Sequence, residues 1–130
     1  MENQIVLLDT SILIDYYRKK DKRKSVLFEL SKNYHSFAVS VITRYEIYIG
    51  AKIDQIDFWD DFFRNLILFP FDTEASKIAV SIHNDLKNKN RLIEVPDLFI
   101  AATAIANNLP CATLNKKHFE RILKLKLIES

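Results

Sequence analysis

Hydrophobic and polar positions fall into blocks along this chain, and the first hydrophobic block ends abruptly at an acid. Four apolar residues, Ile5–Leu8, come directly before Asp9. A short apolar run bounded by polar residues is typical of a buried strand in a parallel sheet. The helical spacing of Ile12 and Tyr16 then predicts a helix over Ser11–Arg18. Asp9 is therefore expected at the carboxyl end of a central strand, where open α/β sheets bind their ligands.

The same kind of pattern continues towards the C-terminus. Strands are predicted at 36–40, 66–71 and 111–114, with an edge strand at 125–128, and helices at 22–32, 41–51, 55–65, 73–89, 96–106 and 119–123. Strands alternate with helices, and there are no repeats, linkers or low-complexity segments. This rhythm predicts a single α/β domain over residues 1–130 with a parallel sheet.

Composition narrows the classes of protein. Apolar residues make up 48% of the 130 positions, enough for a packed core. No apolar run approaches the roughly 18 residues of a membrane span, and the N-terminus does not resemble a signal peptide. A single cysteine, Cys111, excludes an internal disulfide and a zinc site built from thiolates. We therefore expect a cytoplasmic protein with no membrane partner.

Glycine and histidine usage exclude several catalytic motifs. Gly50 is the only glycine, whereas a Walker loop, a dinucleotide-binding loop and a nucleophile elbow each need at least two. His35, His83 and His118 are scattered, so no H-E-x-x-H zinc motif exists. Enzymatic chemistry in this chain is therefore expected to depend on acids.

Two further acids stand out by their position. Glu46 shares a helical stripe with Ile42, Tyr45 and Ile49, and an uncompensated acid on an apolar stripe costs several kcal/mol. It either reaches water at the edge of the stripe, pairs with a buried arginine, or serves a site. Asp97 is the acid at the head of an otherwise uncharged helix, where the dipole favours an anion by ~0.3–1 kcal/mol; a simple N-terminal cap is the alternative.

Asp9, Glu46 and Asp97 would have to be stabilised if the fold brings them together. At ~4 Å and an effective dielectric of 20, each pair of carboxylates repels by about 4 kcal/mol. Protons or a divalent cation relieve such repulsion, and oxygen-only ligands favour Mg²⁺ or Mn²⁺. Such an ion can activate a water molecule against a phosphodiester. With 17 acids in the chain, spacing alone does not single out this triplet.

Two surface features each allow two interpretations. Six of the seven residues of Arg18–Lys24 are basic, which suits a solvated connection or a patch that contacts phosphate. The helix at 55–65 carries Phe58, Trp59, Phe62 and Phe63, which suit core packing or a partner groove or dimer face.

Four segments resemble the PIN domain and, within that family, the VapC-type toxins of bacterial toxin–antitoxin pairs. Leu8–Asp15 (LDTSILID) resembles the opening motif, and Ser40–Gly50 (SVITRYEIYIG) resembles the helix that carries the family's glutamate. Asp97–Ala104 (DLFIAATA) and Thr113–Phe119 (TLNKKHF) resemble the two closing motifs. The order and spacing of all four agree with the family from Leu8 to Phe119.

The resemblance implies a three-layer α/β/α fold, whose central, mostly parallel sheet has four to five strands, and a metal-dependent endoribonuclease that uses Mg²⁺ or Mn²⁺. Asp9, Glu46 and Asp97 match the family's acidic metal ligands and are the expected catalytic residues. Asp9 and Asp97 would hold the metal most directly, with Glu46 as a ligand or as a base that orients water.

Supporting roles follow from the same resemblance. Ser11 and Thr113 match polar residues that support the acids. Asn115 and His118 stand where other PIN domains can carry acids, which departs from the family pattern. The amide oxygen of Asn115 can still hold a water on the metal, and His118 either contacts phosphate or covers the end of a helix.

The expected partners are an RNA substrate, a cognate antitoxin that covers the site, and a second copy of the chain in a homodimer. The aromatic segment Phe58–Phe63 and the face formed by Tyr16 and Tyr17 are the candidate contact surfaces. The alternative function is a non-catalytic PIN-like module that binds RNA or protein, which the neutral Asn115 would suit. A phospho-acceptor domain of receiver type is disfavoured because Asp9 has no acidic neighbour.

Overall fold

The first strand shows how the sequence builds this fold, which a computed structural model describes for residues 4–129. β1 (Ile5–Leu8) is buried on both faces, because Leu7 packs into one hydrophobic cluster while Val6 and Leu8 pack into another. Successive side chains of a strand point to opposite faces of the sheet. A continuous apolar run therefore requires helices on both sides, which is the three-layer α/β/α arrangement predicted from the sequence.

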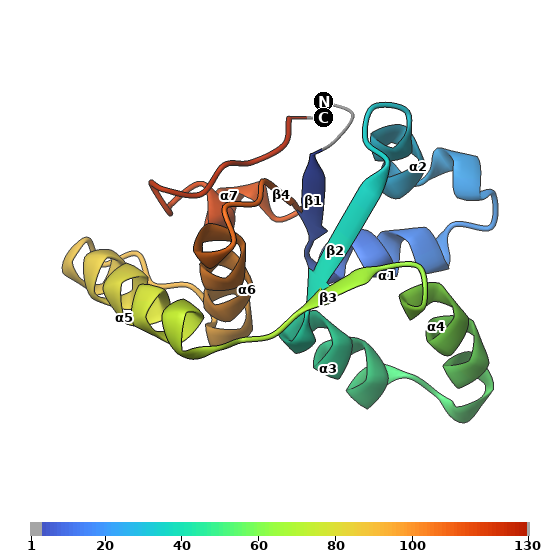
Figure 1. The fold of residues 1–130 in the computed structure, drawn as a ribbon, viewed down its shortest axis with the longest axis horizontal. Helices are drawn as coiled ribbons and strands as arrows, with labels where there is room; N and C mark the ends of the chain where they lie inside the picture. Colours follow the sequence, from blue (N-terminus) through green and yellow to red (C-terminus); the bar gives the residue numbers. More distant parts are fainter. Residues whose placement is uncertain (1–3, 130) are drawn as a thin grey trace.

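The described chain contains four strands and seven α-helices. The strands are β1, β2 (Ser36–Ser40), β3 (Ile67–Phe69) and β4 (Cys111–Ala112), and the α-helices are α1 (Thr10–Arg18), α2 (Val26–Ser31), α3 (Val41–Gly50), α4 (Ile56–Phe63), α5 (Thr73–Asn88), α6 (Val95–Ala106) and α7 (Lys116–Phe119). Two short 3₁₀ helices, η1 (Lys22–Lys24) and η2 (Ile53–Gln55), precede α2 and α4. Figure 1 shows α5 and α6 on one side of the sheet and α1, α2 and α4 on the other.

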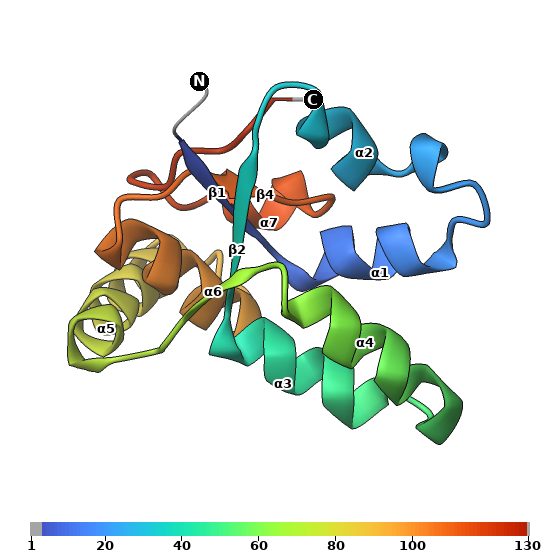
Figure 2. The same cartoon turned by 45° about the vertical axis from the view of Figure 1, so that its right-hand side comes forward.

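The order of the strands locates the functional edge. All pairs are parallel, and the order is β3-β2-β1-β4. The chain moves outward from β1 to β2 and β3, and then crosses to the opposite side of β1 to add β4. Adjacent parallel strands whose connections leave in opposite directions form a crevice at their carboxyl ends, which is where such sheets bind ligands. In this sheet the corresponding position is at the ends of β1 and β4, which are paired neighbours (Figure 2).

The two layers of helices differ in the side chains that they pack against the sheet. On one face, α5 and α6 bring Ala79, Ile82, Ile100 and Ala104 against Leu7, with Phe119 fully buried beside them. The small alanines let these two helices pack closely, and their contact is the most extensive between helices in the described chain. The opposite face is aromatic, with Trp59 stacked on Tyr17 of α1.

Several predicted boundaries were wrong. The helix predicted at 22–32 is interrupted at Ser25, because the Ser25 hydroxyl accepts a hydrogen bond from the Phe28 backbone N–H and starts a new helix there. The strand predicted at 111–114 ends at Ala112, and the helix predicted at 119–123 is instead Lys116–Phe119. Residues 125–128 form only one parallel bridge to Cys111, through Leu127.

One lysine of the basic segment Arg18–Lys24 stabilises the end of α1. The Lys22 ammonium donates to three backbone carbonyl oxygens at the end of α1, those of Tyr16, Tyr17 and Lys19, at 2.6–2.9 Å. It also lies 4.9 Å from the centre of the Tyr16 ring. A cation at a helix C-terminus satisfies carbonyls that the helix itself leaves open. Lys22 is therefore committed to closing α1 and is unavailable to phosphate.

None of the helices described for residues 4–129 combines the length and the apolar character that crossing a membrane requires.

Candidate active site

Asp9 joins the end of β1 to the start of α1. Its side chain caps α1 by accepting from the Ile12 N–H at 3.3 Å, and such caps stabilise a helix by about 1 kcal/mol. The residue is only 3% exposed. Burial raises the pKa of Asp9, while the hydrogen bonds that it accepts work in the opposite direction. The structure thus places Asp9 at the strand end predicted from the sequence, with a carboxylate withdrawn from water.

Two hydroxyl groups hold this carboxylate. Ser11 Oγ donates to Asp9 Oδ1 at 2.6 Å, and Thr113 Oγ1 donates to Asp9 Oδ2 at 2.5 Å. Each hydroxyl also accepts a backbone N–H from the loop after β4, that of Leu114 for Ser11 (3.0 Å) and that of Asn115 for Thr113 (2.8 Å). Because the backbone N–H groups occupy their acceptor sides, both hydroxyls are oriented to donate towards Asp9. Ser11 and Thr113 both contact Asp9, and their supporting role in catalysis stays a prediction.

Glu46 reaches the same region from α3. Thr10 Oγ1 donates to Glu46 Oε1 at 2.5 Å and lies 3.0 Å from Thr43 Oγ1, so α1 and α3 are joined by polar contacts beside the acid. The predicted stripe was wrong in part, because Tyr45 and Ile49 are 63% and 70% exposed. The buried positions of α3 are instead Thr43 and Ile47. Glu46 therefore stands at the edge of the buried face.

Asp97 comes from the first turn of α6. The capping position belongs to Glu94, and the Asp97 side chain makes no capping bond, so the simple cap interpretation does not hold. Burial raises the pKa of Asp97, and the negative charges of Asp9 and Glu46 raise it further. The three predicted acids, which come from three different elements, are therefore close enough to interact electrostatically.

Asn115 and His118 complete the Asp97 side of the site. The Asn115 amide nitrogen donates to Asp97 Oδ2 at 3.4 Å and lies 2.7 Å from His118 Nδ1. His118 Nδ1 lies 3.9 Å from Asp97 Oδ2, and its positive charge, when protonated, lowers the pKa of that acid. With its amide nitrogen engaged in this way, Asn115 keeps its amide oxygen as a possible ligand.

The donors suit a divalent cation of the magnesium type. Within residues 4–129, neither Asp9 nor Glu46 forms an ion pair with lysine or arginine. Over the same residues, no three acidic, histidine or cysteine side chains converge tightly enough to form a metal site as they stand. Mg²⁺ usually retains several waters and binds one or two carboxylates directly, so a looser group of acids fits its chemistry.

Sequence reasoning missed the roles of Thr10 and Thr43. Thr10 was visible only as part of the first motif, and Thr43 only as a neighbour of Glu46 one turn away. The contacts of Thr10 with Glu46 and with Thr43 depend on the packing of α1 against α3. No local signal in the sequence reports that packing.

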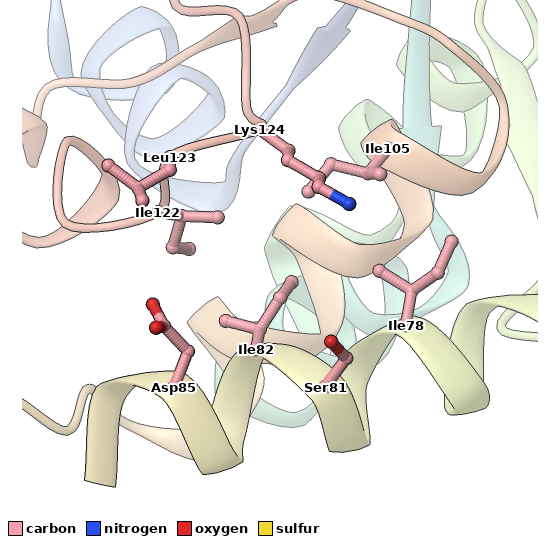
Figure 3. A pocket seen from close by; sticks show the side chains of 8 residues that line it. All are labelled: Ile78, Ser81, Ile82, Asp85, Ile105, Ile122, Leu123 and Lys124. Carbon is pink, nitrogen blue, oxygen red and sulfur yellow. The ribbon is translucent and has the colours of Figure 1, made fainter. Parts of the chain in front are cut away.

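A groove elsewhere in the molecule differs from the acidic site in having a mainly apolar wall. It has a volume of about 370 Å³ and lies between α5, α6 and the turns after α7 (Figure 3), where it is lined mainly by isoleucines with Asp85 and Lys124. None of the predicted site residues lines it. With a single carboxylate in an apolar wall, this groove offers no metal site.

Several known proteins resemble this chain in sequence. The family model of the PIN domain matches residues 6–125. Ribonuclease VapC1 of Methanocaldococcus jannaschii is 37% identical over 127 residues, which cover 97% of this chain and 87% of the relative. Ribonuclease VapC of Rickettsia bellii is 33% identical and covers 95% of this chain and 94% of its own length.

Solved structures show the same fold. The chain is similar to VapBC2 from Rickettsia felis bound to a DNA fragment from its promoter, with a TM-score of 0.84 at 30% identity over 96% of this chain and 98% of the other. It is also similar to VapBC-1 from nontypeable Haemophilus influenzae, with a TM-score of 0.82 at 25% identity over 97% and 98% of the two chains.

Proposed function

Because this chain belongs to the PIN-domain family, within its VapC group, we propose that it is a metal-dependent endoribonuclease that acts in the cytoplasm as the toxin of a toxin–antitoxin pair. One observation carries the catalytic part of the proposal. Asp9, Glu46 and Asp97 gather at the carboxyl edge of a parallel sheet, and the charges of the first two raise the pKa of the third. A group of acids with this mutual repulsion is stabilised when a divalent cation binds.

Asp9 and Asp97 would hold Mg²⁺ or Mn²⁺ most directly, with Glu46 as a third ligand or as the group that orients water. When bound, the ion would polarise the scissile phosphate and lower the pKa of the attacking water. Ser11 and Thr113 keep the Asp9 carboxylate in place through the hydrogen bonds described above. Such fixed outer partners typically account for a 10- to 100-fold effect on metal affinity or activity.

The contact between Thr10 and Glu46 gives the two oxygens of this acid different roles. Oε1 accepts the Thr10 hydroxyl, while Oε2 has no hydrogen-bond partner among residues 4–129. Oε2 is therefore free to accept the proton that water loses as it attacks the phosphorus atom. The substrate is RNA by inference from the relatives, and Lys117 in α7, the helix that follows Asn115, is a candidate cation for its phosphates.

The protein partners would be an antitoxin and a second copy of the chain. The aromatic helix α4 serves both the core and the surface, because Trp59 is 4% exposed whereas Phe58 and Phe62 are only partly buried. A groove of about 440 Å³ runs between α1, α2 and α4, with Tyr16, Phe58 and Phe62 in its wall. This aromatic groove is our candidate for partner contact, since interface cores are rich in aromatic residues.

A double variant tests the proposal. Wild type should bind Mn²⁺ in a calorimetric titration and cleave RNA, whereas Asp9→Asn combined with Asp97→Asn should lose both properties while the protein stays folded by circular dichroism. Asp54→Asn combined with Asp57→Asn removes the same charge from exposed positions and is the matched control. Full activity in the first double variant would rule out this site.

The alternative is a PIN-like module that binds RNA or protein without cutting. The neutral Asn115 beside Asp97 favours it, because the site then holds one carboxylate fewer. The same titration separates the two functions. A pure binding module has no need of the metal, so wild type that binds RNA without taking up Mn²⁺ would support the alternative.

A further inference from the structure

Thr43 carries a buried hydroxyl that has no role in the chemistry described so far. The residue lies in the first turn of α3, three residues before Glu46, and its side chain is fully buried. Its hydroxyl oxygen lies 3.0 Å from Thr10 Oγ1, and this is its only hydrogen bond within residues 4–129. Valine has nearly the same shape and would fill the position without a polar atom. A buried hydroxyl costs desolvation, which only a specific hydrogen bond offsets.

A second buried threonine shows what a hydroxyl in a helix usually does. Thr103 is also fully buried, and its hydroxyl donates at 2.8 Å to the carbonyl oxygen of Phe99, four residues earlier in α6. Threonine in a helix commonly bonds its own backbone in this way. Thr43 forms no such bond in the part of the chain that the structure describes. Its hydroxyl is instead directed to a different helix, α1, through Thr10.

The contacts of the two threonines have a direction. Thr10 has one hydroxyl proton and two neighbouring oxygens, Glu46 Oε1 at 2.5 Å and Thr43 Oγ1 at 3.0 Å. An ionised carboxylate only accepts, and it draws a hydroxyl to about 2.5–2.7 Å, so the Thr10 proton belongs to the shorter contact. The Thr43 proton then has one acceptor available, Thr10 Oγ1. The hydrogen bonds therefore run from Thr43 through Thr10 to Glu46.

We propose that Thr43 is a positioning residue of the reaction centre that acts through Thr10 on Glu46; the proposal rests on the ribonuclease function proposed above. By donating to Thr10 Oγ1, Thr43 holds the Thr10 hydroxyl in the orientation that donates to Glu46 Oε1. Oε1 is then occupied, and Oε2 remains the oxygen that accepts the proton of the attacking water. Without the Thr43 hydroxyl, the Thr10 hydroxyl is free to rotate and Glu46 loses its fixed orientation.

The position of Thr10 extends this effect to a second acid. Thr10 is the first residue of α1 and directly follows Asp9, whose carboxylate caps the same helix through the Ile12 N–H. The hydrogen bond from Thr10 to Glu46 therefore joins α3 to the helix end that Asp9 caps. Reacting groups that are misplaced by as little as 1 Å can lose about a hundredfold in rate. Fixing Glu46 relative to Asp9 is thus a function that a hydroxyl at position 43 can serve and a methyl group cannot.

Variants of nearly equal shape isolate the hydroxyl. Thr43→Val removes it, Thr43→Ser restores it, and Thr43→Ala takes the place of Thr43→Val if circular dichroism shows that valine does not fold. Thr103→Val removes the other buried hydroxyl, which is bonded inside α6, and is the matched control. Thr10→Val and the double variant Thr10→Val with Thr43→Val complete a cycle that separates an effect through Thr10 from a direct one.

Two measurements on the full chain test the proposal. In the first, single-turnover cleavage of RNA at saturating protein and Mn²⁺ gives the rate of the chemical step, and calorimetry gives the Mn²⁺ affinity. Thr43→Val should cleave about tenfold more slowly with unchanged Mn²⁺ affinity, whereas Thr43→Ser and Thr103→Val should cleave like wild type. In the Thr10→Val background, Thr43→Val should slow cleavage no further. In the second, urea denaturation in EDTA should show that the losses in midpoint of Thr10→Val and Thr43→Val are less than additive.

The outcomes separate this inference from the function beneath it. A wild-type rate in Thr43→Val, an equal loss in Thr43→Ser, or a further tenfold loss on top of Thr10→Val overturns the inference and leaves the ribonuclease intact. A loss of Mn²⁺ affinity in Thr43→Val with a wild-type rate at saturation also overturns it, because Glu46 then acts as a metal ligand. Absence of cleavage by wild type overturns the proposed function, and the urea cycle then decides the hydrogen-bonded chain alone, which additive losses would disprove.

Discussion

The two sides of the acidic centre are built differently. Asp9 is 3% exposed and accepts hydrogen bonds from two side-chain hydroxyls and one backbone N–H. Asp97 is half-buried and has one long contact from Asn115 at 3.4 Å, with His118 at 3.9 Å. One acid is fixed before any ligand arrives, whereas the other retains freedom to adjust. In the proposed function, a pre-organised ligand beside an adjustable one would let the site bind the metal at little cost in reorganisation.

The difference follows from the supporting elements. Asp9 stands between β1 and β4 at the crevice of the sheet, where the Asp9 N–H donates to the Ala112 carbonyl at 3.1 Å. Asp97 projects from the first turn of a helix, and within residues 4–129 its side-chain hydrogen bond and ion pair come from Asn115 and His118. Strand ends in a parallel sheet have their backbone fixed on both sides, while a helix start has free N–H groups and fewer neighbours.

The largest expected effect comes from removing the fixed acid. Asp9→Asn should reduce RNA cleavage roughly a thousandfold, because metal stabilisation of the transition state is worth several kcal/mol. The loss of cleavage in Asp97→Asn should be about tenfold smaller than in Asp9→Asn, since the adjustable side leaves room for a neutral oxygen ligand. Single-turnover rates at saturating Mn²⁺ measure both. Equal losses in the two variants would contradict the asymmetry.

Thr113→Val weakens the fixed side without touching an acid. It removes the hydroxyl that donates to Asp9 and accepts from Asn115, so we expect a loss of about 1–3 kcal/mol in the free energy of unfolding and a 10- to 100-fold loss of Mn²⁺ affinity. Urea denaturation and calorimetry measure these quantities.

Thr103→Val is the matched control for this change. Thr103 is also fully buried, but its hydroxyl donates to the Phe99 carbonyl of its own helix. The Thr103→Val variant should lose about 1 kcal/mol or less in its free energy of unfolding and keep its metal affinity. A fall in metal affinity in this control would show that the effect of Thr113→Val is not local.

The free energy of unfolding of the metal-free protein should depend on pH more strongly through Asp9 than through Asp97. The pKa of Asp9 is raised above 3.8 by burial, so the folded state binds this proton more tightly than the unfolded state does. Its contribution to stability is fully present below 3.8 and is lost as pH rises through the folded pKa. In EDTA, the free energy of unfolding should fall as the pH rises from 3.8 through the folded pKa of Asp9. Asp9→Asn should reduce this fall more than Asp97→Asn does, because Asp97 is more exposed to solvent than Asp9. Urea midpoints from about pH 4 to pH 7 provide the check.

Much of the fold could be predicted from sequence because the signals are local, whereas the choice of Asp9, Glu46 and Asp97 among the 17 acids came from the resemblance to the PIN domain. An apolar run that stops at Asp9 marks a buried strand end, and the uncharged turns after Asp97 mark a buried helix. The rest depended on tertiary contacts. Thr10 supports Glu46 only because α1 packs against α3, and Ser25 interrupts the predicted helix because its hydroxyl caps a new one.

The C-terminal region was predicted least well for a similar reason. β4 ends at Ala112 because Thr113 and the N–H groups after it are used to orient the Asp9 carboxylate. A propensity-based prediction extends the strand through Leu114, since Thr113 and Leu114 both suit a strand. The hydrogen bonds that Thr113 makes to Asp9 and Asn115 override that local preference. The next helix, α7, begins at Lys116 and not at the predicted residue 119.

Asn115→Asp should have the smallest effect and tests the adjustable side directly. The new carboxylate would lie near Asp97 Oδ2, where the Asn115 amide is now 3.4 Å away, and repulsion should lower the stability of the metal-free protein slightly. With Mn²⁺ present, the additional anionic ligand should raise metal affinity by at most about tenfold, the lower end of outer-partner effects. Paired calorimetric titrations of wild type and variant measure the change. Tighter binding would show that Asp97 and residue 115 share one ion, whereas unchanged affinity together with lowered stability would place residue 115 outside the metal site and confine the adjustable side to Asp97 alone.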